Sequence, residues 1–360
     1  METIRVNLGD RSYDITIRTG GLSTIGEWAA RFSLGNRLLL VTDEHTEALF
    51  GETAVQSLKQ IGFLPTMVTV PAGESSKSLD MADRIYEQAI RAGLDRDSAI
   101  LALGGGVVGD LTGFVAATYL RGVPFLQVPT TLLAQVDSSV GGKVAVDHAL
   151  GKNLIGAFYQ PRGVLIDPQV LISLPEREFA SGMAEVIKYG LIFDAAFLTE
   201  LRTDALAVLG RDPQQMERIV ARCCRMKAAV VERDEQDVGD RMLLNFGHTA
   251  GHAIETAGGF ERFTHGEGVA LGMLTATRLS ELTGMIPAGT VAEVRSLLET
   301  YGLPVHCGGL RANELIRRMG TDKKREAGTL RWVLLEKPGR AVIRKDVSLE
   351  FVDEALQVIL

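Results

Sequence analysis

The sequence predicts an N-terminal α/β domain with a parallel, Rossmann-like sheet, followed by an all-α, or mainly helical, C-terminal domain. Two observations predict this fold class. Short apolar runs alternate with segments of helical period in the first half of the chain, which is typical of a parallel sheet with helices on both faces. Segments of helical period then dominate. We therefore expect an α/β domain over residues 1–172 and a helical domain over residues 173–360.

The first domain is expected to begin with a hairpin, since Ile4–Leu8 and Tyr13–Ile17 flank the turn Gly9-Asp10-Arg11. Arg37–Asp43 and Ser98–Leu103 are short apolar runs, as expected for buried parallel strands. Further strands are predicted at Thr66–Val70, Phe125–Val128 and Val164–Asp167, and helices at Thr46–Ile61 and Leu79–Ala92.

The second domain shows helical period in most of its length, and strand patterns return only near the end. Helices are predicted at Pro175–Phe193, Pro213–Arg233, Asn245–Ala257, Glu267–Thr283 and Thr290–Tyr301, and strands at Leu330–Leu335 and Ala341–Ile343.

Composition excludes several classes of protein. The 360 residues include 38 Lys and Arg against 45 Asp and Glu, a net charge of −7, which argues against a general nucleic-acid binder. The three cysteines form no CxxC pair, so we expect neither a disulfide framework nor a thiolate metal site. The chain starts without a signal-peptide pattern and contains no long apolar run, so we expect a cytoplasmic protein without a membrane partner.

A glycine cluster joins a predicted strand to a predicted helix. Gly104-Gly105-Gly106 is followed by Gly109 and Asp110. Without side chains the backbone can approach a diphosphate, whose charge is favoured by N–H groups at a helix N-terminus. A tight strand-to-helix turn would give the same pattern. No acidic residue ends a strand about 20 residues after the loop, where the usual ribose contact would lie, and Asp43, at the end of an earlier strand, is the better candidate.

Three of the six histidines, His248, His252 and His265, lie within 18 residues. Helical spacing puts Asn245, His248, His252 and Glu255 on one face. Imidazoles at this density suit Zn(II), and the i,i+4 pair is a known ligand arrangement. A helix with a solvated polar face is the alternative.

A carboxylate would complete the three protein ligands of a catalytic zinc, and Glu185 in the helix Pro175–Phe193 is a candidate. Glu185 and Lys188 share the face opposite Met183, Val186 and Ile187. The alternative is a surface Glu–Lys pair.

Several basic residues stand next to glycines. Lys143 follows Gly141-Gly142, and Lys152 follows Gly151. A lysine on a glycine turn can reach toward a phosphate or carboxylate. Each of these lysines, considered alone, matches an ordinary surface lysine. They would form a binding site only if their side chains lie close together in the fold.

Together these segments resemble the 3-dehydroquinate synthase family across nearly the whole chain. The motifs, in chain order, are GESSK from Gly73, GGGVVGDLTGF from Gly104, VPTTLLAQVDSSVGGK from Val128, GKNLIGAFYQP from Gly151, SGMAEVIKYG from Ser181, LNFGHTAGHAIE from Leu244, HGE from His265 and DKK from Asp322. Two departures are Val144, where the family usually has Thr, and the segment Trp332–Glu336, which lacks the customary Leu-Pro.

The resemblance implies a dehydroquinate synthase-like fold with an NAD-binding N-terminal domain, a metal- and substrate-binding C-terminal domain and an active site in the cleft between them. It implies a homodimer in which Arg121 reaches the substrate phosphate of the neighbouring subunit. It implies Zn(II), with Co(II) as an alternative, on Glu185, His248 and His265. His252, which spacing alone allowed as a ligand, would instead contact substrate and assist proton transfer.

The resemblance also assigns the remaining site residues. The substrate pocket would be lined by Asp137, Lys143, Lys152, Asn153, Lys188, Lys227, Arg241, Asn245 and Lys323 or Lys324. NAD would be held by Asp43, Glu74, Lys77, Gly105, Gly106, Val107, Asp110, Thr130, Thr131, Ser173, Leu174 and Glu178, with Asp137, Lys143 and Lys152 close by.

The implied reaction converts a phosphorylated keto-sugar acid, 3-deoxy-D-arabino-heptulosonate 7-phosphate, to 3-dehydroquinate and phosphate, the second step of the shikimate pathway. It proceeds by transient oxidation with NAD, phosphate elimination, reduction and intramolecular aldol closure. Alternatives are a related sugar-phosphate cyclase, a metal-dependent polyol dehydrogenase of the same architecture, and a catalytically silent NAD-binding protein.

Overall fold

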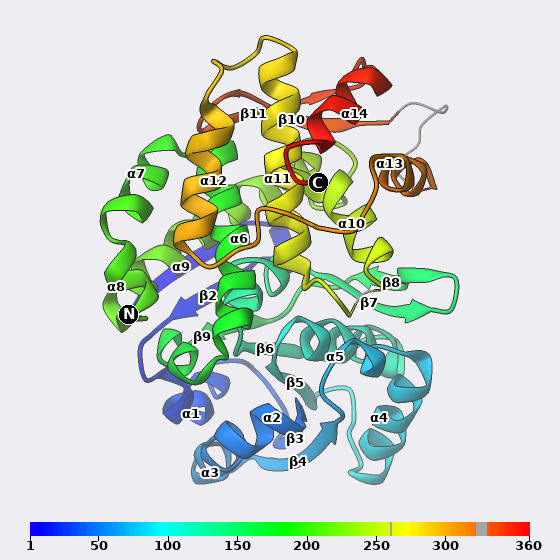
Figure 1. Cartoon of the computed structure of the whole chain (residues 1–360). Helices are drawn as coiled ribbons and strands as arrows, with labels where there is room; N and C mark the ends of the chain where they lie inside the picture. Colours follow the sequence, from blue (N-terminus) through cyan, green and yellow to red (C-terminus); the bar gives the residue numbers. More distant parts are fainter. Residues whose placement is uncertain (260, 322–329) are drawn as a thin grey trace. The chain divides into compact units, whose positions relative to one another are not determined.

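The computed structural model describes residues 1–259, 261–321 and 330–360, which group into two compact units (Figure 1). The first unit comprises Met1–Leu174 and Pro213–Gln236, and the second comprises Pro175–Asp212 and Asp237–Leu360. Helix α9 (Pro213–Arg233), which we expected in the second domain, therefore groups with the first unit. The reason is its apolar side, which packs against β1 (Glu2–Val6), β2 (Tyr13–Ile17) and the turn at Ala134–Ser138. A division of binding tasks at residue 172 stays a prediction.

A seven-stranded sheet forms the centre of the first unit, in the order β1-β2-β9-β6-β5-β3-β4. Only β1 and β2 pair antiparallel, which confirms the predicted hairpin, and the other neighbours are parallel. The strands are β1 (Glu2–Val6), β2 (Tyr13–Ile17), β3 (Arg37–Asp43), β4 (Leu64–Val70), β5 (Ala99–Gly104), β6 (Phe125–Pro129) and β9 (Gly163–Ile166).

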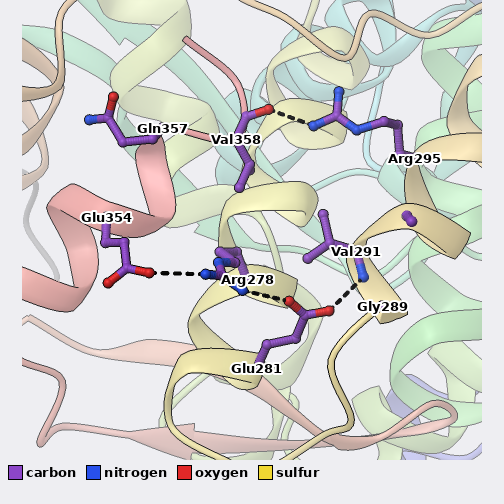
Figure 2. A pocket seen from close by; sticks show the side chains of 9 residues that line it. Arg278, Glu281, Gly289, Val291, Arg295, Glu354, Gln357 and Val358 are labelled. Carbon is purple, nitrogen blue, oxygen red and sulfur yellow. Dashed lines mark hydrogen bonds and ion pairs between the residues drawn. The ribbon is translucent and has the colours of Figure 1, made fainter.

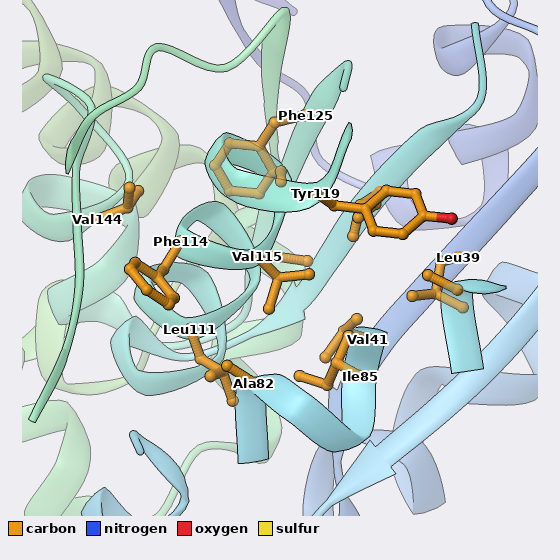
Figure 3. Packing of buried hydrophobic residues seen from close by; sticks show 14 of the residues in the cluster. Leu39, Val41, Ala82, Ile85, Leu111, Phe114, Val115, Tyr119, Phe125 and Val144 are labelled. Atoms are coloured by element: carbon orange, nitrogen blue, oxygen red, sulfur yellow. The ribbon is translucent and has the colours of Figure 1, made fainter. Parts of the chain in front are cut away.

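Helices pack on both faces of this sheet, as the strand–helix alternation predicted. Side chains alternate along a strand, so Leu39 and Val41 of β3 point to one face and Leu38 and Leu40 to the other. The first face packs against α4 (Leu79–Arg91), α5 (Gly106–Thr118) and β7 (Lys143–His148), as Figure 3 shows for part of the cluster. The second face packs against α1 (Ile25–Ala29) and α3 (Glu52–Gln60).

Two details of the first unit differ from expectation. The helix predicted at Thr46–Ile61 is divided, because a π-helical turn at Glu47–Gly51 joins α2 (Glu44–Thr46) to α3. A further hairpin, β7 (Lys143–His148) and β8 (Gly151–Phe158), was not predicted. Val144, one of the departures from the family pattern, is buried there among the side chains of α5.

The second unit is mainly helical, with one antiparallel hairpin in the region where strand patterns return. Helix α11 packs against α6, α10, α12, α14 and β10. The elements are α6 (Glu176–Phe193), α7 (Ala195–Thr203), α8 (Ala205–Leu209), α10 (His248–Ala257), α11 (His265–Leu282), α12 (Thr290–Thr300), α13 (Ala312–Thr321), β10 (Trp332–Lys337), β11 (Arg340–Arg344) and α14 (Leu349–Leu356). Among the described residues, no helix combines the length and apolarity that crossing a membrane requires.

Helix α10 begins three residues later than expected. Gly247 has φ +81°, a left-handed conformation that interrupts the helix and that glycine adopts readily. Asn245 therefore lies in the 3₁₀ turn Asp240–Asn245 and not on the helix face of His248.

The three cysteines are buried and form no disulfide, so we expect them to be unreactive in the folded protein. Burial raises the pKa of Cys224 to about 12. At pH 8 roughly one thiol in ten thousand would then be the nucleophilic thiolate. Titration with a chromogenic disulfide reagent should detect no fast thiol in the native protein and 3 after denaturation. A fast-reacting equivalent under native conditions would contradict this.

Candidate functional site

Helices α6, α10 and α11 bring Glu185, His248 and His265 together in the second unit. One ligand-type atom from each lies within 4.8 Å of the others. The Nε2 atoms of His248 and His265 both lie 3.6 Å from the same oxygen, Glu185 Oε1. Two imidazoles and one carboxylate form the donor set typical of a catalytic zinc with an open position.

Glu185 is buried in a way that ordinary side-chain packing does not explain. Its side chain is 0% exposed, and neither carboxylate oxygen accepts a hydrogen bond from any described residue. Lys188, one turn later on α6 and equally buried, forms an ion pair with Oε2 without hydrogen-bond geometry. The surface-pair alternative is therefore wrong. A buried carboxylate that lacks hydrogen bonds is costly unless a cation binds it, and here Lys188 supplies one such charge beside Oε2, while the two imidazoles face Oε1.

The two neighbouring carboxylates give the cluster a negative field. Partial burial opposes a charge on His265, but Glu185 and Glu255 outweigh it and raise the pKa of His265 to about 10. The arrangement thus favours a positive charge at this point, either a proton on the imidazole or a metal ion in its place.

Glycines allow the three helices to approach this closely. A Cβ on Gly266 of α11 would lie 2.0 Å from the backbone oxygen of Ser181 in α6. A Cβ on Gly272 would lie 1.8 Å from the backbone oxygen of Gly247, directly before α10. Neither space holds a methyl group, so these glycines set the separation of the helices and with it that of the ligands.

Hydrogen bonds also fix the position of the first turn of α11, which begins at His265. Thr264 and Glu267 form a capping box, in which each side chain accepts a hydrogen bond from the other's backbone N–H. Arg177 of α6 donates to both carboxylate oxygens of Glu267, each at 2.7 Å. The backbone that carries His265 is therefore tied to α6.

The other predicted site residues of the second unit differ in their burial and in their distance from the histidine cluster. His252 lies beside the cluster, its ring centroid 5.4 Å from that of His248 and 6.2 Å from that of His265. Arg241 is buried, Asn245 is half-buried and Glu178 is exposed near the start of α6. Lys323 and Lys324 lie outside the described residues.

In the first unit the predicted nucleotide residues gather at one edge of the sheet. Parallel strands end at the same edge, and the ends of β3, β4, β5 and β6 are followed by candidate residues. Gly105 is the N-cap of α5 and has no side chain, so the N–H groups of the first turn receive no hydrogen bond from a capping side chain. The candidates at this edge are Asp43, Glu74, Lys77, Gly105, Gly106, Val107, Asp110, Thr130 and Thr131.

Several of these candidates already have partners within the unit. Lys77 donates to Asp110 at 2.5 Å, and although burial opposes its charge, Asp110 raises the pKa of Lys77 above its ordinary value. Lys152 pairs with Glu74 at 3.2 Å. Asp43 caps α2, accepting from the N–H groups of His45 and Thr46. The sequence indicated a ribose contact for Asp43 and missed this cap.

The predicted substrate residues of the first unit lie on α9, the β7–β8 hairpin and a turn. Lys227 of α9 donates to both the backbone oxygen and the side chain of Asp137, at 2.6 and 2.7 Å. Lys143 and Asn153 lie exposed on the hairpin. Arg121 is exposed after α5, with φ +69°, an uncommon conformation for arginine. Ser173 is exposed and Leu174 half-buried near the end of the first segment.

Two contacts to the histidines were not predicted. Glu255 lies 3.5 Å from His265 Nδ1, and the backbone oxygen of Phe246 lies 3.2 Å from His248 Nδ1. Helical spacing had placed Glu255 on the same face as the histidines, and this spacing could have predicted the first contact. The sequence contains no pattern that predicts a contact to a backbone carbonyl.

A cavity of about 460 Å³ lies elsewhere in the second unit, among residues of α11, α12 and α14 (Figure 2). None of the predicted site residues lines it. Arg278 pairs with Glu281 and Glu354, and Glu281 also accepts from the backbone N–H of Val291. These charges satisfy one another, so the cavity carries no argument for a ligand.

We expect Gly272→Ala to destabilise the protein, because its methyl group has no room beside the backbone of Gly247. Overpacking of this kind costs about 1–3 kcal/mol of unfolding free energy. Gly308→Ala is a matched control, since a Cβ there meets nothing within 4 Å. Denaturant unfolding of both variants measures the effect. Equal stability of the two would contradict the close approach.

Comparison with known proteins gives concordant matches. A family model described as 3-dehydroquinate synthase N-terminal matches residues 67–181, and one described as 3-dehydroquinate synthase C-terminal matches residues 182–325. The chain is 49% identical over 349 residues to a 3-dehydroquinate synthase of Desulforamulus reducens, which covers 97% of each chain.

Solved structures of similar fold include a 2-deoxy-scyllo-inosose synthase complexed with carbaglucose-6-phosphate, NAD+ and Co2+, at 26% identity and TM-score 0.90 over 100% of each chain. A 2-epi-5-epi-valiolone synthase from Streptomyces hygroscopicus with NAD+ and Zn2+ bound also has 26% identity and TM-score 0.90, and 98% of this chain and 97% of that one are covered.

Proposed function

The chain belongs to the 3-dehydroquinate synthase family, and from this premise we propose that it is an NAD- and metal-dependent carbon–oxygen lyase. It converts 3-deoxy-D-arabino-heptulosonate 7-phosphate to 3-dehydroquinate and phosphate. The observation that carries the metal dependence is the buried Glu185 carboxylate, on which two imidazoles converge.

Glu185, His248 and His265 would hold Zn(II) or Co(II). The fit rests on the donor types and on the two Glu185 oxygens that accept no hydrogen bond within the described chain. Glycine packing and the capping box of α11 fix the helix backbones that carry the three side chains, so we expect little backbone reorganisation on binding.

The edge of the first unit's sheet would hold NAD, with the diphosphate at the uncapped start of α5. A Cβ on Gly105 or Gly106 would come within about 3 Å of Thr131 or Ser138, so the loop is already closely packed on its own side. The proposed NAD residues are Asp43, Glu74, Lys77, Gly105, Gly106, Val107, Asp110, Thr130, Thr131, Asp137, Lys143, Lys152, Ser173, Leu174 and Glu178.

Bound NAD supplies a hydride acceptor that becomes the donor later in the cycle, and the metal supplies a Lewis acid. The chain's own contribution is charge and position. Buried Lys188 and Arg241 would neutralise the anionic substrate, and Asp137 holds the Lys227 ammonium in one place for the same purpose. His252, next to the metal ligands, would move protons. Lys143, Lys152, Asn153, Asn245 and Lys323 or Lys324 are proposed as further substrate contacts.

We also propose a homodimer, in which the exposed Arg121 would reach the phosphate bound by the other subunit. Its turn is compatible with this role, because Leu120, Arg121 and Gly122 all have positive φ, which ends the helical course of the chain after α5 and leaves Arg121 exposed. We place the enzyme in the cytoplasm, where thiols such as the three buried cysteines stay reduced.

The proposal is tested by following phosphate release from the heptulosonate phosphate while recording NADH absorbance, with NAD and zinc each added or withheld. We expect phosphate release that needs both and no net NADH. Absence of phosphate release from this substrate would favour a related sugar-phosphate cyclase. Steady NADH production from a polyol would favour the dehydrogenase alternative.

His265→Ala should lose zinc and turnover while the fold is retained. The loss of zinc affinity should exceed the roughly 10- to 100-fold that removal of an outer-shell partner costs. His306→Ala, at an exposed histidine of the same unit, is the control. Zinc content after dialysis, turnover and thermal unfolding are measured for both. Retained zinc and full turnover in His265→Ala would refute the ligand assignment.

A further inference from the structure

The two proposed histidine ligands share one arrangement. His248 directs Nε2 toward Glu185 Oε1 and has a backbone oxygen, that of Phe246, 3.2 Å from Nδ1. His265 directs Nε2 toward the same Glu185 oxygen and has Glu255 Oε1 3.5 Å from Nδ1. In each ring one nitrogen faces the metal position and the other faces an oxygen acceptor.

An imidazole that binds a metal through Nε2 carries its hydrogen on Nδ1. An acceptor beside Nδ1 fixes this tautomer and the plane of the ring, and a carboxylate acceptor also makes the ligand more basic. We infer that Glu255 is a positioning residue, which orients His265 for metal binding as the Phe246 carbonyl orients His248. This inference rests on the metal site of the proposed function.

The surroundings of Glu255 fit this task. The residue is 7% exposed on α10, three positions after His252. A Cβ on Gly268 of α11 would lie 3.0 Å from Glu255 Cγ, so the missing side chain at 268 makes room for the glutamate against α11. Gly251 and Gly268 also bring the two helices together, since a Cβ on Gly251 would lie 3.0 Å from the Gly268 oxygen.

A second ligand set competes with this assignment, because His252, Glu255 and His265 also lie close enough to hold a metal. In that set Glu255 would be a ligand itself. The geometry favours Glu185, since both His248 and His265 point Nε2 at its Oε1 and its oxygens accept no hydrogen bond in the described chain. His265 would face the second set with Nδ1 instead.

The test compares zinc affinity in the full-length protein, stripped of metal and titrated against a chromophoric chelator. The variants are Glu255→Ala, Glu255→Gln and Glu185→Gln, with Glu281→Gln as the matched control. Glu281 is a carboxylate on α11 that pairs with Arg278, away from the three histidines in sequence. The visible spectrum of the Co(II)-loaded protein reports the ligand geometry, and thermal unfolding checks the fold.

We expect Glu255→Ala to lower zinc affinity about 10- to 100-fold and to shift the Co(II) bands. Glu255→Gln keeps an acceptor oxygen of the same reach and should lose less. Glu185→Gln should lose binding outright, and Glu281→Gln should match the parent protein. A change confined to thermal unfolding would mean a purely structural role.

Two results would overturn the inference. Parent-like affinity and Co(II) spectra in both Glu255 variants would show that His265 needs no such partner. Loss of binding in Glu255→Gln with retention in Glu185→Gln would make Glu255 a ligand. If the unsubstituted protein itself binds no zinc, the proposed metal site fails, and this outcome is distinguishable because it precedes any variant.

Discussion

The helices of the second unit approach one another at points where only a hydrogen atom fits between their backbones. Gly266 meets Ser181 of α6, and Gly272 meets Gly247 at the start of α10. This close approach lets the imidazoles of His248 and His265, on two helices, converge on one carboxylate oxygen of Glu185 on a third. The separation of Glu185, His248 and His265 is therefore a consequence of helix packing before it is a matter of metal chemistry.

In the first unit, a mostly parallel sheet brings the candidate nucleotide-binding residues together. Because β3, β5 and β6 run parallel, a charged or glycine-rich segment that follows each strand arrives at one edge. The helices on both faces keep the sheet buried, so the polar groups at the edge are presented by a rigid support. The pairs Lys77–Asp110 and Lys227–Asp137 further restrict side chains that would otherwise carry considerable rotamer entropy.

Local pattern was sufficient for much of the fold. The apolar run Arg37–Asp43 became β3 with the same limits, and the spacing of His248, His252 and Glu255 placed them on one helix face. Pairings between distant segments were not predictable, since Lys77 and Asp110 are 33 positions apart and nothing local links them. The burial of polar side chains could not be predicted either. The helix face that carries Glu185 and Lys188 is polar in sequence, yet both side chains are buried. The start of α10 was missed because the local sequence does not reveal that Gly247 adopts a left-handed backbone angle, which it does at a close contact with α11.

The Lys188 ammonium beside Glu185 has a consequence for the protein before a metal ion is bound. An internal cation neutralises the buried carboxylate, so the helices can assemble around it without waiting for zinc. Small zinc domains, by contrast, stay unfolded until the ion arrives. Folding and metal binding would then be separate steps, so that the metal-free chain could keep its fold and bind the ion afterwards.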